Sequence, residues 1–240
     1  MKKQLSNKKE KKPAWKLAQQ RLLAGPLGDL MDWSYVHCNE DYPMAKGDWA
    51  YATSDGDVFL NPRRQADVSE WQYVISHCLL HLGMGHMDKL RMEDRAWIMA
   101  CDLVVTRFLR DSRIGTPPPE FQAEFPIPVK DEEQTYERLL LEPELLKKSE
   151  MFSTMSLGRP DMVWTYKSHC DYTEIFADSL QNAIRRALGS FRDTNESDSI
   201  PNTPYHRARE WFISSYPLLG ALAASFRIVD DRNAVYRIQR

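Results

Sequence analysis

The stretch His-Cys-Leu-Leu-His-Leu-Gly-Met-Gly-His at 77–86 holds three of the chain's six histidines. His77 and His81 are four residues apart, so on an α-helix they lie on one face and can bind one metal ion together. The apolar residues around them recur at helical spacing: Trp71, Val74, Ile75, Cys78 and Leu82. The stretch therefore predicts a core helix with a metal site on it.

Two imidazoles supply half of a tetrahedral zinc shell, so a third protein ligand is needed. His86 is the nearest candidate, because Gly83 and Gly85 can turn the chain after the helix and bring it back. Asp102 is the other candidate, since a carboxylate in an apolar helical run must be paired, protonated or metal-bound when buried. We expect His77, His81 and His86 to be the ligands. Asp102 then holds a ligating imidazole by its second nitrogen, or replaces His86 as a ligand.

The segments around this helix predict an α+β fold. Asp55-Gly56 lies between the apolar runs 49–53 and 58–60, which is typical of a tight β-hairpin. A Ser-x-x-Gln capping box at Ser69 marks the start of the metal-site helix. Helices are further expected on both sides, at 15–30 with a break at Gly25-Pro26, and at 93–109, 131–141, 172–188 and 207–226.

The chain divides into four segments on these patterns. Residues 1–14 are rich in lysine and predict a basic flexible tail, for which a weak contact with nucleic acid is the alternative. Residues 15–143 hold the hairpin and the metal-site helix. Residues 144–171 lack periodicity and predict a linker or irregular segment, and residues 172–240 predict a mainly helical C-terminal region.

Composition excludes several classes of protein. The net charge of −2 gives no general attraction to nucleic acid or membranes. No apolar run is long enough for a membrane span, and the basic start is not followed by the apolar region of a secretory signal, so we expect a cytoplasmic protein. The four cysteines are widely spaced without a Cys-x-x-Cys pair, which argues against a disulfide framework and a thiolate zinc finger.

Three pieces of the sequence together resemble a family of bacterial metallopeptidase domains. These pieces are Thr53-Ser54-Asp55-Gly56 through Asn61-Pro62, the stretch VISHCLLHLGMGH, and WIMACDLVV at 97–105. The family pattern His-Glu-x-x-His with a further histidine matches His77, His81 and His86, and its Ala-x-Asp matches Ala100 and Asp102. The resemblance implies a zincin-like core, in which a small antiparallel hairpin or sheet packs on the metal-site helix, and a bound Zn²⁺ ion. It also implies a peptide or protein partner, with a MoxR-type ATPase as the family's example.

Cys78 departs from this pattern, because zinc peptidases carry a glutamate there as the general base. A thiol relays protons poorly at neutral pH, so we expect a protein that binds zinc and has little or no peptidase activity. Three alternatives stay open: an active zinc peptidase with another base, which would align an extended peptide on the hairpin edge; a non-catalytic interaction module that uses the same groove; and a helical protein in which His77 and His81 bind no metal.

A faint internal similarity relates the end of the chain to its beginning. Tyr216–Leu222 resembles the stretch from Gly25 to Leu30 that leads into the hairpin. A repeat would make the C-terminus the start of a second metallopeptidase-like unit, in this chain's continuation or in a partner.

Overall fold

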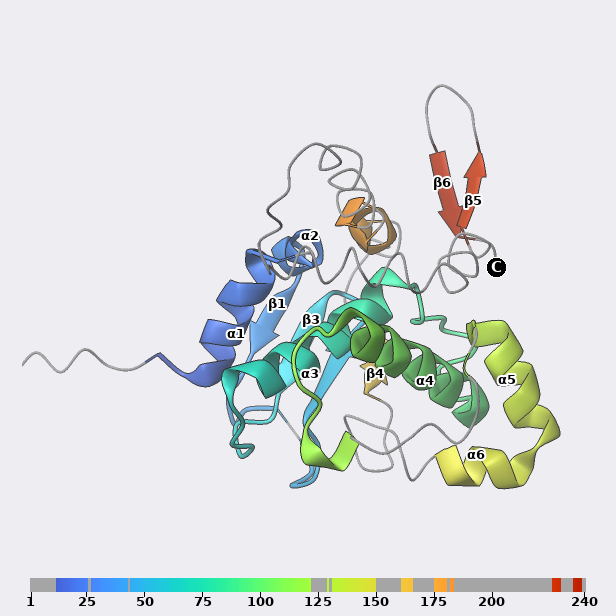
Figure 1. Cartoon of the computed structure of the whole chain (residues 1–240), viewed down its shortest axis with the longest axis horizontal. Helices are drawn as coiled ribbons and strands as arrows, with labels where there is room; N and C mark the ends of the chain where they lie inside the picture. The colour runs from blue at the N-terminus through green and yellow to red at the C-terminus, as the bar shows by residue number, and fades with distance from the viewer. Residues whose placement is uncertain are drawn as a thin grey trace, which may run out of the picture.

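The fold combines several helices with a small mixed sheet, which confirms the α+β class (Figure 1). The computed structural model describes residues 12–25, 27–42, 44–121, 129, 131–149, 161–165, 175–180, 182–183, 226–229 and 235–238. Most of the predicted basic tail at 1–14 therefore lies outside the described residues. None of the described helices is both long and apolar enough to cross a lipid bilayer.

The sheet has four strands in the order β1-β3-β2-β4: β1 (Tyr35–His37), β2 (Ala50–Thr53), β3 (Asp57–Leu60) and β4 (Met162–Val163). Strands β2 and β3 form the predicted antiparallel hairpin, and Gly56 adopts a φ of 90° in its turn. β1 pairs with β3 and β4 pairs with β2, both in parallel. Both outer edges of the hairpin are thus covered by other strands, so the expectation of a free hairpin edge that aligns a peptide was wrong.

Helix α3 (Val68–Gly83) lies at the centre of the fold. It packs against α1 (Ala14–Leu23), α2 (Gly28–Asp32), α4 (Arg95–Ser112) and the hairpin strands, and nearly all of its residues from Trp71 onward are buried. Figure 1 shows α3 and α4 crossing the middle of the molecule, with the sheet behind them. A helix that is covered on so many sides can place polar side chains in the interior only where they find partners.

Helix α3 begins with a capping box at Asp67 and not at the predicted Ser69. Asp67 is the N-cap, its side chain accepts from the backbone of Ser69 and Glu70, and the Glu70 carboxylate accepts from the Asp67 N–H. The predicted box at Ser69 was wrong, because Asp67 offers the same type of acceptor two residues earlier and allows a longer helix.

The later part of the chain differs most from expectation. Residues 144–171, expected to be a linker or irregular segment, contain most of α6 (Pro143–Ser149) as well as β4. α6 follows α5 (Glu132–Leu141), which matches the helix predicted at 131–141, and a short 3₁₀ helix, η1 (Pro119–Phe121), follows α4.

Within the predicted helical region 172–240, residues 175–180 and 182–183 are helical. β5 (Phe226–Val229) and β6 (Val235–Ile238) pair as an antiparallel ribbon. The predicted helix at 207–226 falls almost wholly outside the described residues, and the repeat at 216–222 lies outside them altogether.

Candidate metal centre

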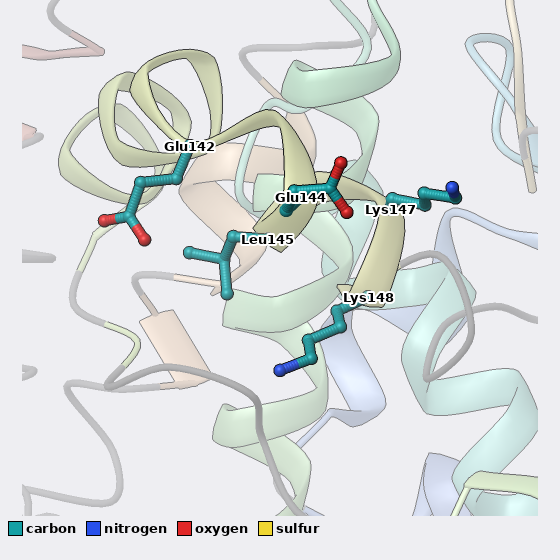
Figure 2. A pocket seen from close by; sticks show the side chains of 5 residues that line it. All are labelled: Glu142, Glu144, Leu145, Lys147 and Lys148. Carbon is teal, nitrogen blue, oxygen red and sulfur yellow. The ribbon is translucent and has the colours of Figure 1, made fainter.

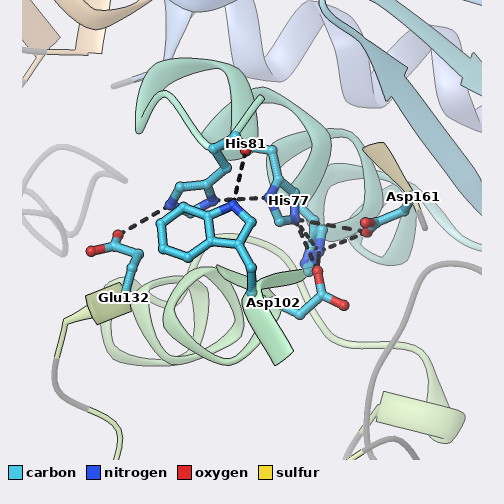
Figure 3. A network of polar contacts seen from close by, with 7 residues as sticks. His77, His81, Asp102, Glu132 and Asp161 are labelled. Atoms are coloured by element: carbon cyan, nitrogen blue, oxygen red, sulfur yellow. Dashed lines mark hydrogen bonds and ion pairs between the residues drawn. The ribbon is translucent and has the colours of Figure 1, made fainter. Parts of the chain in front are cut away.

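Four buried side chains from three elements meet beside α3. His77 and His81 come from α3, Asp102 from the middle of α4, and Asp161 from the residue before β4 (Figure 3). Nε2 of His77 lies 3.0 Å from Oδ2 of Asp161, and Nε2 of His81 lies 3.2 Å from Oδ1 of Asp102. The two Nε2 atoms are 2.9 Å apart. The four candidate ligand atoms all lie within 4.8 Å of one another, and no side chain of the four is more than 2% exposed.

The spacing of these atoms fits one metal ion. Ligand atoms at zinc-like bond lengths in a tetrahedron are about 3.3 Å apart. Five of the six separations here lie between 2.9 and 3.7 Å: three are given above, and the two remaining His-to-Asp separations, His77 to Asp102 and His81 to Asp161, are 3.7 Å each. The observed separations bracket the tetrahedral value, so the four side chains can close around a zinc-sized ion with small shifts.

The chemistry of Asp161 supports the same interpretation. Its side chain is fully buried, and neither carboxylate oxygen accepts a hydrogen bond from the residues that the structure describes. A buried carboxylate is costly unless a cation neutralises it, and here either a bound metal ion or the protonated ring of His77, 3.0 Å away, can do so. Two carboxylates and two neutral imidazoles together match the charge of one divalent ion.

The end of α3 explains where His86 lies. The helix ends at Gly83, and Gly85 adopts a φ of 70°. The Gly85 N–H donates to the Leu82 carbonyl and the His86 N–H donates to the His81 carbonyl, which is the hydrogen-bond pattern of a Schellman turn. As predicted, the glycine turn brings His86 back toward the helix. It brings His86 beside the ring of His81, on the side opposite Asp102 and Asp161.

His86 forms a second layer behind His81. Its Nδ1 lies 3.0 Å from Nδ1 of His81, and its Nε2 lies 3.1 Å from Oε1 of Glu132, the first residue of α5. When Nε2 of His81 binds a metal, Nδ1 carries the proton and donates it to His86, whose Nε2–H donates to Glu132. Burial alone would raise the pKa of Glu132, but the hydrogen bond and charge of His86 hold it below its usual value. With a metal ion bound, this series of hydrogen bonds from His81 through His86 to Glu132 would fix the tautomer and orientation of His81.

The two metal-facing histidines have opposite protonation preferences in the metal-free protein. Burial by itself lowers the pKa of His77, but contacts with Asp102 and Asp161 outweigh it and raise the pKa to about 9. Burial lowers the pKa of His81 well below its usual value. His77 therefore supplies a positive charge between the two carboxylates when no metal ion does.

Cys78 is not part of the cluster. It is fully buried in the hydrophobic core, and burial together with the charges of Asp161 and Asp102 raises the pKa of its thiol well above the ordinary value. Burial, together with the charges of Glu132 and Asp102, likewise raises the pKa of the thiol of Cys101 on α4 well above its ordinary value. Neither thiol is poised to act as a proton relay or nucleophile.

The structure brings together three of the four residues singled out in the sequence. His77, His81 and Asp102 face one point, whereas His86 contacts His81 from behind, so the geometry favours Asp102 over His86 as the third ligand. Asp161 and Glu132 were not anticipated. Asp161 lies in a stretch with little periodicity, and only the pairing of β4 with β2 carries it to the site.

A surface pocket lies where α5 is followed by α6, and its lining differs from that of the metal cluster (Figure 2). Its lining contains acidic and basic side chains around one apolar residue: Glu142, Glu144, Leu145, Lys147 and Lys148. The pocket shares no residue with the metal cluster and offers no histidine or cysteine. It does not extend the candidate site.

No protein-family model, curated protein sequence or solved structure matches this chain. The interpretation of the site therefore rests on its geometry, and the metallopeptidase resemblance stays a prediction.

Proposed function

We propose that this chain is a divalent-metal-binding protein, with Zn²⁺ as the expected ion, that has a zincin-like metal helix and no peptidase activity. His77, His81, Asp102 and Asp161 would hold the ion. The observation that carries the proposal is the meeting of these four side chains, all buried, at mutual distances suited to one metal ion. Bound there, the ion would supply positive charge that ties α3, α4 and β4 together.

The absence of peptidase activity is proposed on two observations. Catalytic zinc sites use three protein ligands and keep one position open, whereas structural sites are closed by four. Here four protein ligands are available and Asp161 is fully buried. Cys78, at the position of the family's general base, is packed in the hydrophobic core.

The donor atoms alone do not select zinc, since two imidazoles and two carboxylates also suit Mn²⁺, Fe²⁺ and Co²⁺.

Elemental analysis of the purified protein tests metal binding. We expect about one divalent ion per chain in the wild type and a loss of that ion in His81→Ala. His37→Ala is the matched control, because His37 is half-buried and pairs with Asp57 at 2.7 Å outside the cluster. Equal metal content in His81→Ala and the wild type, or no metal in either, would contradict the proposal.

Metal removal gives a second, independent readout. A ligand that binds only the folded state stabilises it by about 4 kcal/mol at a thousandfold excess over its Kd. For a domain of this size that corresponds to a rise of about 10 °C in melting temperature. Chelation should remove this increment, and adding Zn²⁺ back should restore it. An unchanged melting temperature would argue for the metal-free alternative.

An interaction role is the second candidate, favoured by two exposed aromatic residues. Tyr35, the first residue of edge strand β1, is 71% exposed, and Trp33, which follows α2, is 53% exposed. Such residues with an edge strand suit a protein partner that adds a strand to the sheet. A MoxR-type ATPase stays the partner suggested by the family resemblance. A pull-down with that ATPase, wild type against Tyr35→Lys, tests it, and equal retention of both proteins would exclude this surface.

A further inference from the structure

The four candidate ligands are not held in the same way. His77, His81 and Asp102 come from α3 and α4, helices of 16 and 18 residues that pack against each other in the core. Their backbones are fixed by helical hydrogen bonds and by buried neighbours on both sides in sequence. Three ligands on two rigid, packed elements are sufficient to hold a divalent ion.

Asp161 reaches the same point from a much shorter element. It precedes β4, a strand of two residues at the edge of the sheet, and its carbonyl accepts from the N–H of Ala52 at 2.7 Å. Its carboxylate contacts the rings of His77 and His81 but accepts no hydrogen bond from the described residues. This carboxylate is therefore attached through a two-residue strand, whereas the other three ligands are carried by packed helices.

From this difference we infer that Asp161 is an internal blocking ligand: it fills a coordination position that the His77, His81 and Asp102 triad would otherwise leave open to a small anion. The inference rests on the proposed metal centre and specifies how that centre is kept closed. Removing the carboxylate should leave a metal site with a vacant position and space for a carboxylate-sized ligand. The chemical class that fits this position is a small monoanion such as azide or formate.

The charges favour the same ligand class. With Asp161 removed, one carboxylate remains beside a divalent ion, and the site carries a net positive charge that an anion can neutralise. In the wild type the position is filled and the side chain is fully buried, so an added anion has neither a vacant position nor uncompensated charge to bind.

Co²⁺-loaded protein provides the test, because the visible absorption of Co²⁺ changes when a ligand enters its coordination shell. Wild type, Asp161→Ala, Asp161→Asn and Asp102→Ala are loaded with Co²⁺ and titrated with azide. Asp48→Asn is the matched control, since Asp48 is also a buried carboxylate but lies outside the cluster. Formate is then added to compete with the bound azide.

We expect Asp161→Ala to retain Co²⁺ and to show a saturable azide response that formate reverses. Wild type and Asp48→Asn should retain Co²⁺ without that response, and Asp102→Ala should lose Co²⁺. Asp161→Asn preserves the side-chain shape and serves as the second variant if alanine impairs folding. We expect it to bind azide with lower affinity than Asp161→Ala does.

Two results would overturn the inference while leaving the metal centre in place. One is an Asp161→Ala protein that holds Co²⁺ without an azide response. The other is loss of Co²⁺ or of the fold in both Asp161 variants, which would make Asp161 an essential ligand. Failure of the wild type itself to bind Co²⁺ and Zn²⁺ would instead refute the proposed function, and the inference with it.

Discussion

Nδ1 of His86 lies 3.0 Å from Nδ1 of His81, so the third histidine of the motif contacts His81 on the side away from the four-residue cluster and does not face that cluster. Glu132 continues this line at 3.1 Å from Nε2 of His86. The contacts connect the first turn of α5 to the end of α3. A second layer of this kind sets the orientation and basicity of the ligand in front of it.

His86→Ala and Glu132→Gln should weaken the metal centre without abolishing it. Loss of such an outer partner typically lowers metal affinity about 10- to 100-fold. His81→Ala should cause a much larger loss, because it removes a ligand. Competition titrations with a chromogenic chelator measure all three. An affinity loss in His86→Ala as large as in His81→Ala would indicate that His86 binds the metal directly.

Gly85→Ala should weaken the same contact through the backbone. Gly85 has a φ of 70°, where a residue with a Cβ atom costs roughly 1–2 kcal/mol. We expect that loss in the free energy of unfolding, together with reduced metal affinity, because His86 follows directly in the turn. Gly85→Asn is the control, since asparagine tolerates this conformation better. Denaturant unfolding and metal titration measure both effects, and equal behaviour of the two variants would contradict the strain argument.

Local features of the sequence predicted much of the secondary structure around the site. The hairpin turn at Gly56 and the helix that carries His77 and His81 are determined by residues close together in sequence, through φ preference and helical periodicity. The glycine turn after α3 was likewise predictable. Whether His86 or Asp102 faces the candidate metal site was not predictable, because the answer depends on how α4 packs against α3.

Asp161 and Glu132 show why the rest of the site could not be predicted. Strand β4 has two residues, too few for an alternating pattern, and its place is set by pairing with β2. Glu132 looks like an ordinary acidic residue in the first turn of a helix, where it favours the helix dipole. Only the tertiary structure shows that it faces His86.

The metal-free protein should lose stability as the pH rises from about 6.5 to about 9. The pKa of His77 is raised from 6.5 to about 9, so its protonated form stabilises the fold below pH 6.5 and that stabilisation disappears as His77 deprotonates near pH 9. This difference in the pKa of His77 between the folded and unfolded states corresponds to about 3 kcal/mol in the free energy of unfolding. Denaturant unfolding with a chelator present, wild type beside His77→Gln, measures it. If the free energy of unfolding depends on pH in the same way in both proteins, the effect belongs to another group.

Cys78→Glu, which restores the general-base residue of zinc peptidases, should destabilise the protein and yield no peptidase. Cys78 is fully buried among core residues, and the nearby Asp102 and Asp161 already carry negative charge. An unpaired buried carboxylate costs about 3–5 kcal/mol, whereas Cys78→Ala as the control should cost about 1 kcal/mol. Thermal unfolding and a fluorogenic peptide assay with Zn²⁺ measure both properties. A Cys78→Glu protein with the wild-type melting temperature and zinc-dependent cleavage would show that position 78 faces an open active site, in conflict with its packing here.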